Sequence, residues 1–276
     1  MDQPRYDSSL LPVLKDSPND SPSSPEVSQQ AIALQNVQFS YPNRPNILRG
    51  INLSIDTGER LGVMGPNGAG KTTLFMAICG ILTPTEGDIL LFDQPIVPGE
   101  FRPEIGLVFQ NPDDQLFSAS VREDVAFGPE NLGLPPDEVD ARVSEVLDLT
   151  GMTDRADRVP HHLSGGEKRM VAIAGVLAMC PKLVIYDEPS ASLDLRARRR
   201  LIQFLQRSQE TILVSSHDLE FILEVCDRVI LIDEGKIVAD GNPRTIMGDA
   251  DLMLAHGLEK PHSLIPHVEP HHDGQS

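Results

Sequence analysis

One short segment limits what this chain can fold into more than any other. Residues 65–72 read Gly-Pro-Asn-Gly-Ala-Gly-Lys-Thr, which fits the pattern G-x-x-x-x-G-K-[ST]. An apolar run at 61–64 precedes this loop, and a helix-compatible segment at 72–79 follows it. A strand, loop and helix in this order surround a phosphate with backbone N–H groups and a helix N-terminus. The segment predicts a nucleotide-binding α/β domain; the alternative is an ordinary glycine-rich helix start.

The residues of this loop have different predicted contacts with a nucleotide. The glycines let backbone N–H groups approach phosphate oxygens, and Lys71 reaches the β and γ phosphates. Thr72 is the predicted Mg²⁺ ligand, and Thr73 is the predicted contact to an α-phosphate oxygen. The predicted nucleotide-binding residues of the loop are Gly65, Pro66, Asn67, Gly68, Ala69, Gly70, Lys71, Thr72 and Thr73.

The apolar pattern predicts two kinds of sheet around this loop. Alternating apolar residues at 32–39 and 51–55 indicate antiparallel strands with one solvent-facing side. Helical stretches lie among short apolar runs, an order that predicts a mostly parallel sheet. These runs lie at 61–64, 105–109, 183–186 and 212–214.

Other segments of the chain carry weaker patterns. Residues 111–179 have helical periodicity and predict a helical subdomain inserted into the sheet domain. Residues 229–232 and 236–238 flank an Asp-Glu-Gly turn and predict a hairpin. Residues 1–30 are rich in Ser and Pro, and the tail from Pro261 is rich in Pro and His, so both are predicted to be unstructured.

A second motif places two acidic residues at the end of a buried strand. Residues 183–186 are Leu-Val-Ile-Tyr, and Asp187, Glu188 and Pro189 follow them directly. Phosphoryl transfer needs a carboxylate that holds metal and another group that positions the attacking water, so this pair fits both parts. The alternative is an acidic turn before a proline, which becomes the minor interpretation beside the Lys71 loop.

A third motif begins an apolar helical stretch at 170–180. It consists of Leu163, Ser164, Gly165, Gly166 and Glu167. Ser164 and Glu167 have the spacing of a capping box, which stabilises a helix start. Two glycines at such a start cost conformational entropy, and they leave N–H groups and the positive end of the helix accessible to an anion. We expect both the cap and anion binding here.

The net charge excludes several kinds of ligand. Lys and Arg number 23 against 41 Asp and Glu, which gives a formal charge of −18. Nucleic acids and anionic membrane surfaces attract basic proteins, so neither is predicted as a partner.

Cys79, Cys180 and Cys226 lie far apart among apolar neighbours and are predicted to be buried free thiols. The longest apolar stretch, 171–180, is too short to span roughly 30 Å of hydrocarbon, so a soluble cytoplasmic protein is expected.

The three motifs, in this order and at these separations, resemble the nucleotide-binding subunit of ATP-binding cassette (ABC) transporters. The resemblance covers about residues 31–245 and implies a P-loop NTPase (RecA-like) α/β core with a mostly parallel sheet. It also implies an N-terminal antiparallel β-subdomain and a helical subdomain at about 111–180. Residues 1–30 are then a disordered extension, and 246–276 a C-terminal extension with a His-rich tail.

The resemblance assigns further residues by their matching positions. Gln110 matches a glutamine that contacts Mg²⁺ or water, and His217 matches a histidine that contacts the γ phosphate. Glu188 becomes the group that positions the attacking water, and Thr72, Gln110 and Asp187 become the Mg²⁺ ligands. Asp194 matches a residue that crosses a dimer interface. Tyr41 is similar to the aromatic residue that stacks on adenine, although a surface aromatic closing the strands fits it nearly as well.

Longer stretches resemble one branch of this family. Residues 108–129 and 163–179, including Glu167 where most of the family has Gln, resemble ATPase subunits of energy-coupling-factor importers. These importers take up vitamins, cobalt or nickel, and residues 255–264 resemble the cobalt and nickel subgroup. His262, His267, His271 and His272 could bind such a metal, although a solvated polar tail is the plainer interpretation. The arginines at 196 and 198–200 are expected on a solvated helix face.

These resemblances imply specific partners. Two copies would enclose two ATP molecules, each site using Lys71, Asp187, Glu188 and His217 of one copy and residues 163–167 of the other. A homodimer is expected, with a heterodimer as the alternative, and integral membrane subunits would hold the ATPases peripherally at the cytoplasmic face of the membrane. The remaining alternatives are a soluble non-transport ATPase of this family and a nucleotide-gated metal-binding protein.

Overall fold

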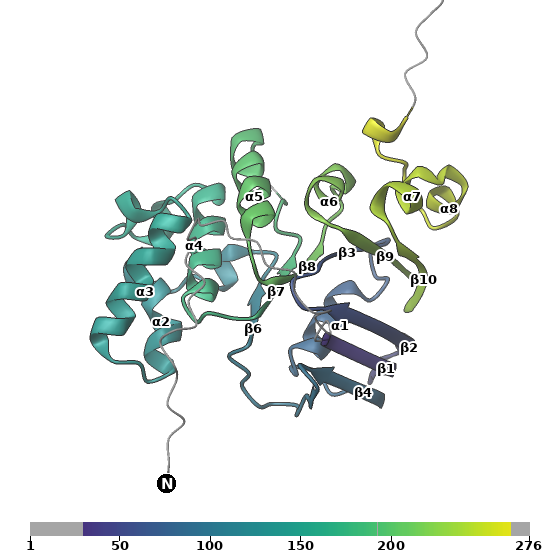
Figure 1. The fold of residues 1–276 in the computed structure, drawn as a ribbon, viewed down its shortest axis with the longest axis horizontal. Helices are drawn as coiled ribbons and strands as arrows, with labels where there is room; N and C mark the ends of the chain where they lie inside the picture. The colour runs from purple at the N-terminus through teal and green to yellow at the C-terminus, as the bar shows by residue number, and fades with distance from the viewer. Residues whose placement is uncertain (1–29, 192, 266–276) are drawn as a thin grey trace, which may run out of the picture.

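The computed structural model describes residues 30–191 and 193–265, which form two sheets and the helices around them (Figure 1). Within these residues a four-stranded antiparallel sheet has the order β2–β1–β4–β5, and a six-stranded sheet has the order β10–β9–β3–β8–β7–β6. The first sheet consists of β1 (Gln30–Tyr41), β2 (Arg44–Asp56), β4 (Glu86–Leu91) and β5 (Gln94–Pro95). The second consists of β3 (Arg60–Met64), β6 (Ile105–Val108), β7 (Leu183–Asp187), β8 (Thr211–Ser215), β9 (Arg228–Asp233) and β10 (Lys236–Gly241).

The six-stranded sheet is mostly parallel, as predicted. Strands β6, β7, β8, β3 and β9 pair in parallel, and β10 pairs antiparallel with β9 as the predicted hairpin. The hairpin's first strand also lies beside β3, a pairing that the local sequence pattern does not reveal. Strands β4 and β5 were missed, because exposed residues at 86–88 interrupt the apolar pattern of β4.

Helices cover both faces of this sheet (Figure 1). Helix α1 (Lys71–Ile78) and the antiparallel sheet pack on one face, where Val63, Ile185 and Leu213 join their core. Helices α5 (Leu195–Arg207) and α6 (Leu219–Val225) pack on the other, where Val184 and Val214 join a second core. Successive strand residues point to opposite faces, so the continuous apolar runs supply both cores.

Between the neighbouring strands β6 and β7, the chain makes a long helical excursion. It contains α2 (Val121–Asn131), α3 (Pro136–Leu149) and α4 (Gly165–Leu177), with short 3-10 turns at Pro112–Asp114, Thr153–Arg155 and Pro160–His162. In Figure 1 these helices gather at one end of the molecule. Helix α4 starts in this group and returns the chain to the central sheet, with Val176 packed against Gly106 of β6.

The C-terminal segment corrects one prediction. Helices α7 (Pro243–Gly248) and α8 (Ala250–Ala255) are followed by a 3-10 turn at His262–Leu264, within a tail expected to be unstructured from Pro261. Pro261 is buried, and the Ser263 hydroxyl donates a hydrogen bond of 2.6 Å to Glu220. Apolar packing of Leu264 completes the attachment. Residues 1–29 and the histidines beyond 265 lie outside the described residues.

Three further predictions can be compared with the fold. Cys226 is buried, but Cys79 and Cys180 are only half-buried, because each follows the last turn of a helix near the surface. The arginines of α5 do face solvent in part, yet Arg198 pairs with Asp218 and Glu224. No helix of the described residues is long and apolar enough to cross a membrane.

Candidate functional site

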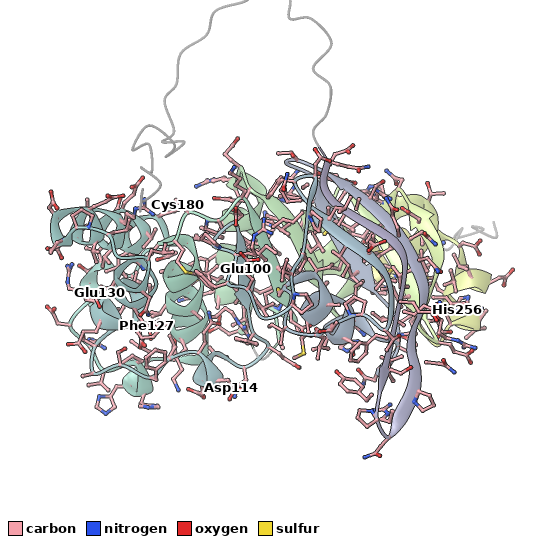
Figure 2. The ribbon with its side chains drawn as sticks, turned by 90° about the horizontal axis from the view of Figure 1, so that it is seen from below. Glu100, Asp114, Phe127, Glu130, Cys180 and His256 are labelled. Atoms are coloured by element: carbon pink, nitrogen blue, oxygen red, sulfur yellow. The ribbon has the colours of Figure 1, made fainter. Side chains whose placement is uncertain are left out.

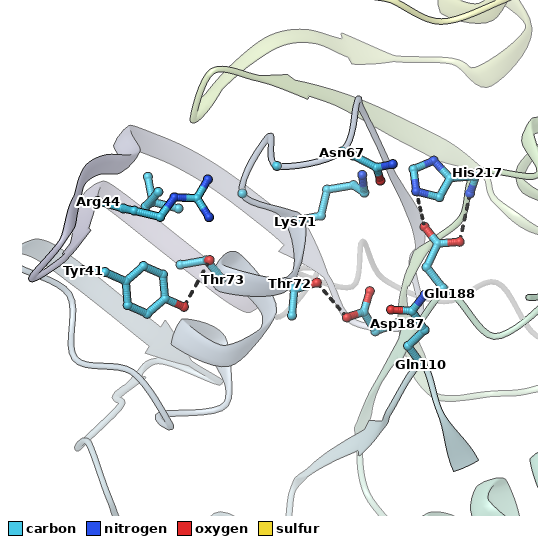
Figure 3. A pocket seen from close by; sticks show the side chains of 13 residues that line it. Tyr41, Arg44, Asn67, Lys71, Thr72, Thr73, Gln110, Asp187, Glu188 and His217 are labelled. Carbon is cyan, nitrogen blue, oxygen red and sulfur yellow. Dashed lines mark hydrogen bonds and ion pairs between the residues drawn. The ribbon is translucent and has the colours of Figure 1, made fainter. Parts of the chain in front are cut away.

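A pocket opens at the carboxyl ends of the parallel strands, between the phosphate loop and the acidic end of β7 (Figure 3). Open α/β sheets bind ligands at this edge, because the loops that follow the strands converge there. The pocket is lined by Tyr41, Arg44, Ile47, Asn67, Gly68, Gly70, Lys71, Thr72, Thr73, Gln110, Asp187, Glu188 and His217. It brings together most of the predicted nucleotide and Mg²⁺ residues, while Gly65, Pro66 and Ala69 lie in the loop but not on the pocket wall.

The phosphate loop, residues 65–72, is held closely against the end of β9. A Cβ added to Gly65 would lie 2.0 Å from the carbonyl oxygen of Ile232, so only glycine fits there. The Lys71 ammonium donates hydrogen bonds to the carbonyl oxygens of Gly65 at 2.7 Å and Pro66 at 3.1 Å. Burial lowers the pKa of Lys71, and the charges of Glu188 and Asp187 oppose that shift. The Lys71 ammonium is therefore held against the backbone of its own loop.

Asp187 connects the phosphate loop to two strands. Its Oδ2 accepts a hydrogen bond of 2.9 Å from the Thr72 hydroxyl, and its Oδ1 accepts one of 2.6 Å from the Ser215 hydroxyl (Figure 3 draws the first). Ser215 Oγ in turn accepts the Glu188 N–H at 3.0 Å. Ser215 therefore fixes both acidic residues, a role that sequence reasoning missed although a polar residue ending an apolar strand was a usable signal.

Glu188 has a buried carboxylate with one committed oxygen and one free oxygen. Its Oε2 accepts the backbone N–H of His217 at 3.0 Å, and its Oε1 lies 3.4 Å from His217 Nε2 (Figure 3). Within the described residues Oε1 has no hydrogen-bond partner, although Glu188 is only 7% exposed. The residue also has φ of 49°, a left-handed conformation that side chains other than glycine rarely adopt. The chain thus holds an unsatisfied acceptor at the pocket wall.

The remaining pocket residues come from the antiparallel sheet and the loop after β6. The Tyr41 hydroxyl lies 3.5 Å from the Thr73 hydroxyl, and the Tyr41 ring packs edge-on against Phe39 at 4.8 Å between centroids. These contacts hold the ring beside the first turn of α1. Gln110 follows β6 and reaches the pocket from the side of the helical excursion.

Residues 163–167, the signature segment, lie away from this pocket. Ser164 caps α4. Its backbone N–H donates a hydrogen bond of 2.9 Å to the Glu167 carboxylate, and the Glu167 N–H donates one of 3.3 Å to the Ser164 hydroxyl. This pair of hydrogen bonds is the predicted capping box. Glu167 also accepts from Arg155 at 2.9 Å, and these donors lower the Glu167 pKa to about 2. Asp194 caps α5 through Ala197 N–H. None of the predicted residues Leu163, Ser164, Gly165, Gly166, Glu167 and Asp194 lines the pocket of its own chain.

Comparison with known proteins decides the family. The chain matches the family described as ABC transporter over residues 48–191. A putative ABC transporter ATP-binding protein of Synechocystis sp. is 56% identical over 234 residues, which cover 85% of this chain and 82% of that protein. The chain belongs to the ABC transporter family. The energy-coupling factor transporter ATP-binding protein EcfA of Methanothermobacter thermautotrophicus is 47% identical over 238 residues, covering 83% of this ABC ATPase and 76% of the relative.

Solved structures agree with this membership. The protein cbiO1 of Clostridium perfringens, part of the ABC transporter complex cbiONQ, has a TM-score of 0.75 and 38% identity, covering 82% of this chain and 94% of its own. A dimeric ATP-binding cassette in a post-hydrolysis state with ADP and phosphate has a TM-score of 0.69 and 26% identity, covering 77% and 98%. The predicted α/β P-loop NTPase fold, the resemblance to the energy-coupling-factor branch and the assignment as an ATP-hydrolysing ABC transporter ATPase are therefore confirmed.

Two pocket residues of this ABC ATPase had no counterpart in the sequence prediction. Arg44 and Ile47 lie on β2, at and just after the turn that follows Tyr41, and both line the pocket. The Arg44 guanidinium points toward the phosphate loop in Figure 3, and no acidic side chain of the described residues pairs with it. Only the hairpin register, which pairs Tyr41 with Arg44, brings this arginine to the site, so no local pattern signals it.

Proposed function

We propose that this ABC ATPase powers a membrane importer of the energy-coupling-factor type and that two copies complete each other's ATP sites. One observation carries the proposal. A single chain assembles the phosphate loop, Asp187, Glu188 and His217 around one pocket, while its signature segment lies elsewhere and lines no part of it. A half-complete site of this kind fits a second chain that supplies the missing groups. The dimeric cassette with ADP and phosphate supports this pairing.

ATP is the substrate of the proposed site. Phosphate oxygens replace the loop carbonyls as partners of Lys71, whose ammonium already lies within 2.7 Å of the Gly65 oxygen. Thr73 contacts the α phosphate, and Tyr41 stacks on the adenine ring. The contact between the Tyr41 and Thr73 hydroxyl groups orients the Tyr41 ring for this stacking. The first turn of α1 places its positive end toward the phosphates, because helix N-termini favour anions.

The donor set of the pocket fits Mg²⁺. Thr72 supplies a hydroxyl oxygen, Gln110 an amide oxygen and Asp187 a carboxylate, and oxygen ligands of this type suit a hard divalent cation. Thr72 and Asp187 already lie 2.9 Å apart, so the two donors are held at one place. When bound, Mg²⁺ neutralises charge on the β and γ phosphates.

Glu188 and His217 are the proposed catalytic pair. The free Oε1 of Glu188 accepts a proton from the attacking water, and the Ser215 and His217 contacts keep that oxygen facing the pocket. His217 is about half exposed at its side chain, which leaves its ring free to contact a γ-phosphate oxygen. The partner copy's signature segment then closes over the same phosphate with the N-terminus of its α4, and Asp194 lies at the interface.

An exposed aromatic pair is the proposed contact with the membrane subunits. Phe117 and Phe127 are 64% and 48% exposed and pack edge-on at 4.8 Å. Buried Asp124 accepts the N–H groups of Phe117 and Ser118 at 3.0 Å, so the loop is fixed with its ring outward. Figure 2 shows Phe127 at the helical end of the molecule, on the same side as Asp114 of the segment that follows Gln110. Such a surface suits an apolar segment of a partner and holds the ATPase at the cytoplasmic face of the membrane.

Cobalt or nickel is the proposed cargo. The similarity to cbiO1 and the resemblance of residues 255–264 to the cobalt and nickel subgroup support it. Vitamin uptake within the same class of importer is the alternative. Uptake of labelled cobalt, nickel and vitamins by cells with and without this gene distinguishes the two, and no change in any of them would contradict the transport proposal.

The substitution Glu188→Gln tests the proposed catalytic site. We expect ATP turnover to fall by at least about 100-fold, the range for loss of a general base, because the amide cannot take the proton. ATP should still bind, so an ATP-bound dimer should accumulate in light scattering. The matched control is Glu100→Gln, which changes an exposed side chain that does not line the pocket. Unimpaired phosphate release in Glu188→Gln would remove Glu188 from the mechanism.

A further inference from the structure

Arg169 is a buried cation that forms no ion pair with any described carboxylate. It is the fifth residue of α4 and only 2% exposed. Its two terminal nitrogens donate hydrogen bonds of 2.5 Å each to the carbonyl oxygens of Phe109 and Gln110, and its Nε has no described partner. Burial lowers the Arg169 pKa to about 10, against the attraction of Asp187. The guanidinium is therefore charged at neutral pH, and it donates its hydrogen bonds to two backbone oxygens.

Lys168, which precedes Arg169 on α4, binds the same loop at a second point. The Lys168 ammonium lies 2.6 Å from Asp113 Oδ1, three residues beyond Gln110. Lys168 holds the Asp113 pKa below its ordinary value by that hydrogen bond. The loop that carries Gln110 into the pocket is thus fastened on both sides of Gln110 to the start of α4.

The same start of α4 carries the signature segment. Ser164 and Glu167 close the capping box there, and Arg155 braces Glu167. Arg169 lies five positions after Ser164 in the sequence, which corresponds to a helical rise of roughly 7.5 Å. Gln110, which lines the pocket, and Ser164, which does not, are therefore attached to one short piece of helix.

We propose that Arg169 is a positioning residue that makes the Gln110 loop and the signature segment move as one unit. This inference rests on the proposed function, in which Gln110 contacts the bound Mg²⁺ and the signature segment serves the partner copy. A nucleotide that draws Gln110 toward its own pocket then also sets the position of the signature segment offered across the interface. Binding in one site and closure of the other become linked, and such a linkage is reciprocal.

A purely structural role makes a different prediction from a positioning role. If Arg169 only satisfies two carbonyl oxygens, its loss lowers the stability of the fold and weakens the binding of every nucleotide equally. If it couples the two segments, the chain's own pocket keeps its affinity for ADP, because no atom of Arg169 lines it. What weakens is the ATP-driven closure of two copies.

The experiment uses the full chain with Glu188→Gln, alone and combined with Arg169→Lys or Arg169→Met. Lys keeps the charge but has one donor nitrogen in place of the two that the planar guanidinium holds at fixed positions, so it should be intermediate, and it guards against a variant that fails to fold. The control is Arg122→Met, on α2, whose nearest carboxylate oxygen is 3.9 Å away. ADP affinity is measured by calorimetry, and the ATP concentration for half-maximal dimer is measured by light scattering.

We expect the ADP dissociation constant to change less than about twofold, and the ATP needed for half-maximal dimer to rise at least about tenfold in Arg169→Met, a coupling of ordinary size. Dimer formation at unchanged ATP in both Arg169 variants would overturn the inference, as would a parallel loss of ADP affinity. Failure of Glu188→Gln alone to dimerise would instead contradict the proposed function, so the two failures are separable.

Discussion

Arg44 and Arg49 both lie on strand β2 and carry the same charge, but their side chains have different surroundings. Arg49 donates to the Glu234 carbonyl oxygen at 3.3 Å and lies 3.5 Å from its carboxylate. Arg44 lines the nucleotide pocket without a described partner, in a chain whose formal charge is −18. A guanidinium kept free of so many carboxylates is available for phosphate oxygens, with which its planar N–H groups pair well.

Replacing Arg44 should therefore weaken nucleotide binding rather than turnover. For Arg44→Gln we expect dissociation constants of ATP and ADP to rise about tenfold, as for one lost charge-assisted hydrogen bond. Because Arg44 lies on the hairpin side of the pocket and away from Glu188, kcat should stay within about twofold. Calorimetry and steady-state kinetics measure the two effects.

The matched control for that prediction is Arg49→Gln, which removes the same charge from the same strand outside the pocket. Equal losses of affinity in both variants would mean that general charge matters and that Arg44 makes no specific contact. A change confined to kcat would also contradict the prediction.

Site residues differ in how far the sequence reveals them. The residues at 65–73 and the pair Asp187 and Glu188 are readable because their chemistry is contiguous in the chain. Ser215 and Arg44 are not, because each acts through a neighbour that only folding supplies: the adjacent strand β7 for Ser215, and the turn after Tyr41 for Arg44. The signature segment was readable as a motif, yet its distance from the pocket of its own chain required coordinates.

At the scale of elements, the contact between β6 and α4 depends on one missing side chain. A Cβ added to Gly106 would lie 2.2 Å from Val176 Cγ1 of α4 and 3.3 Å from Pro181. The close approach matters because β6 leads into Gln110 and α4 carries the signature segment. Glycine at 106 sets the separation between these two elements.

We expect Gly106→Ala to lower the free energy of unfolding by about 1–3 kcal/mol, since overpacking a core costs this much. For a domain of this size the melting temperature falls roughly 2–4 °C for each kcal/mol. Val176→Ala should relieve the clash, so the double variant should lose less stability than the sum of the single variants. Gly248→Ala is the control, because nothing lies within 4 Å of the added Cβ. Strict additivity in calorimetric melting would show that Val176 is not the obstacle.

The C-terminal segment provides a second prediction at this scale. Removing residues 261–276 deletes the buried Pro261 and the Ser263 contact with Glu220, so the melting temperature should fall by several degrees, roughly 2–4 °C per kcal/mol lost. Removing only 266–276 keeps those contacts and should leave the melting temperature unchanged. The shorter deletion is therefore the proper test of the histidine tail, and unchanged metal uptake in it would exclude a primary metal-binding role.

Elements were predictable where the apolar pattern was continuous and local. The four parallel runs and the late hairpin follow from such patterns. Strand β4 begins with Glu86, Gly87 and Asp88, which hide its pairing with β1, and the pairing of β9 with β3 joins residues about 170 positions apart in sequence. The 3-10 turn after Pro261 depends on contact with α6, which no tail composition predicts.

For the whole molecule, the surplus of 18 negative charges constrains how it meets a membrane. An anionic leaflet attracts basic segments, and each basic residue near it contributes about 1 kcal/mol to membrane binding. The net negative charge of this chain opposes that attraction. No helix of residues 30–191 and 193–265 is long and apolar enough to cross a membrane. Because the net charge opposes binding to anionic lipid, the attachment that we propose uses protein contacts, at the Phe117 and Phe127 surface.

In flotation assays at physiological salt, we expect the isolated protein to stay unbound to vesicles rich in phosphatidylserine and to neutral vesicles alike. Membranes that contain the transporter's integral subunits should recruit it. Phe117→Ser with Phe127→Ser should reduce that recruitment at least about tenfold and leave the turnover of the isolated ATPase unchanged, since buried aromatic anchors dominate interfaces. Binding to lipid alone would contradict the proposed mode of attachment.

The position of β3 in the sheet also has a consequence during synthesis on the ribosome. The strand that leads into the phosphate loop is made early, yet its neighbours β8 and β9 begin at residues 211 and 228. The Ile232 carbonyl that backs Gly65 emerges later still. A nascent chain shorter than about 230 residues has the loop sequence but no wall behind it. We therefore expect the phosphate loop to be supported as in the full fold only after nearly all of the sheet has been translated.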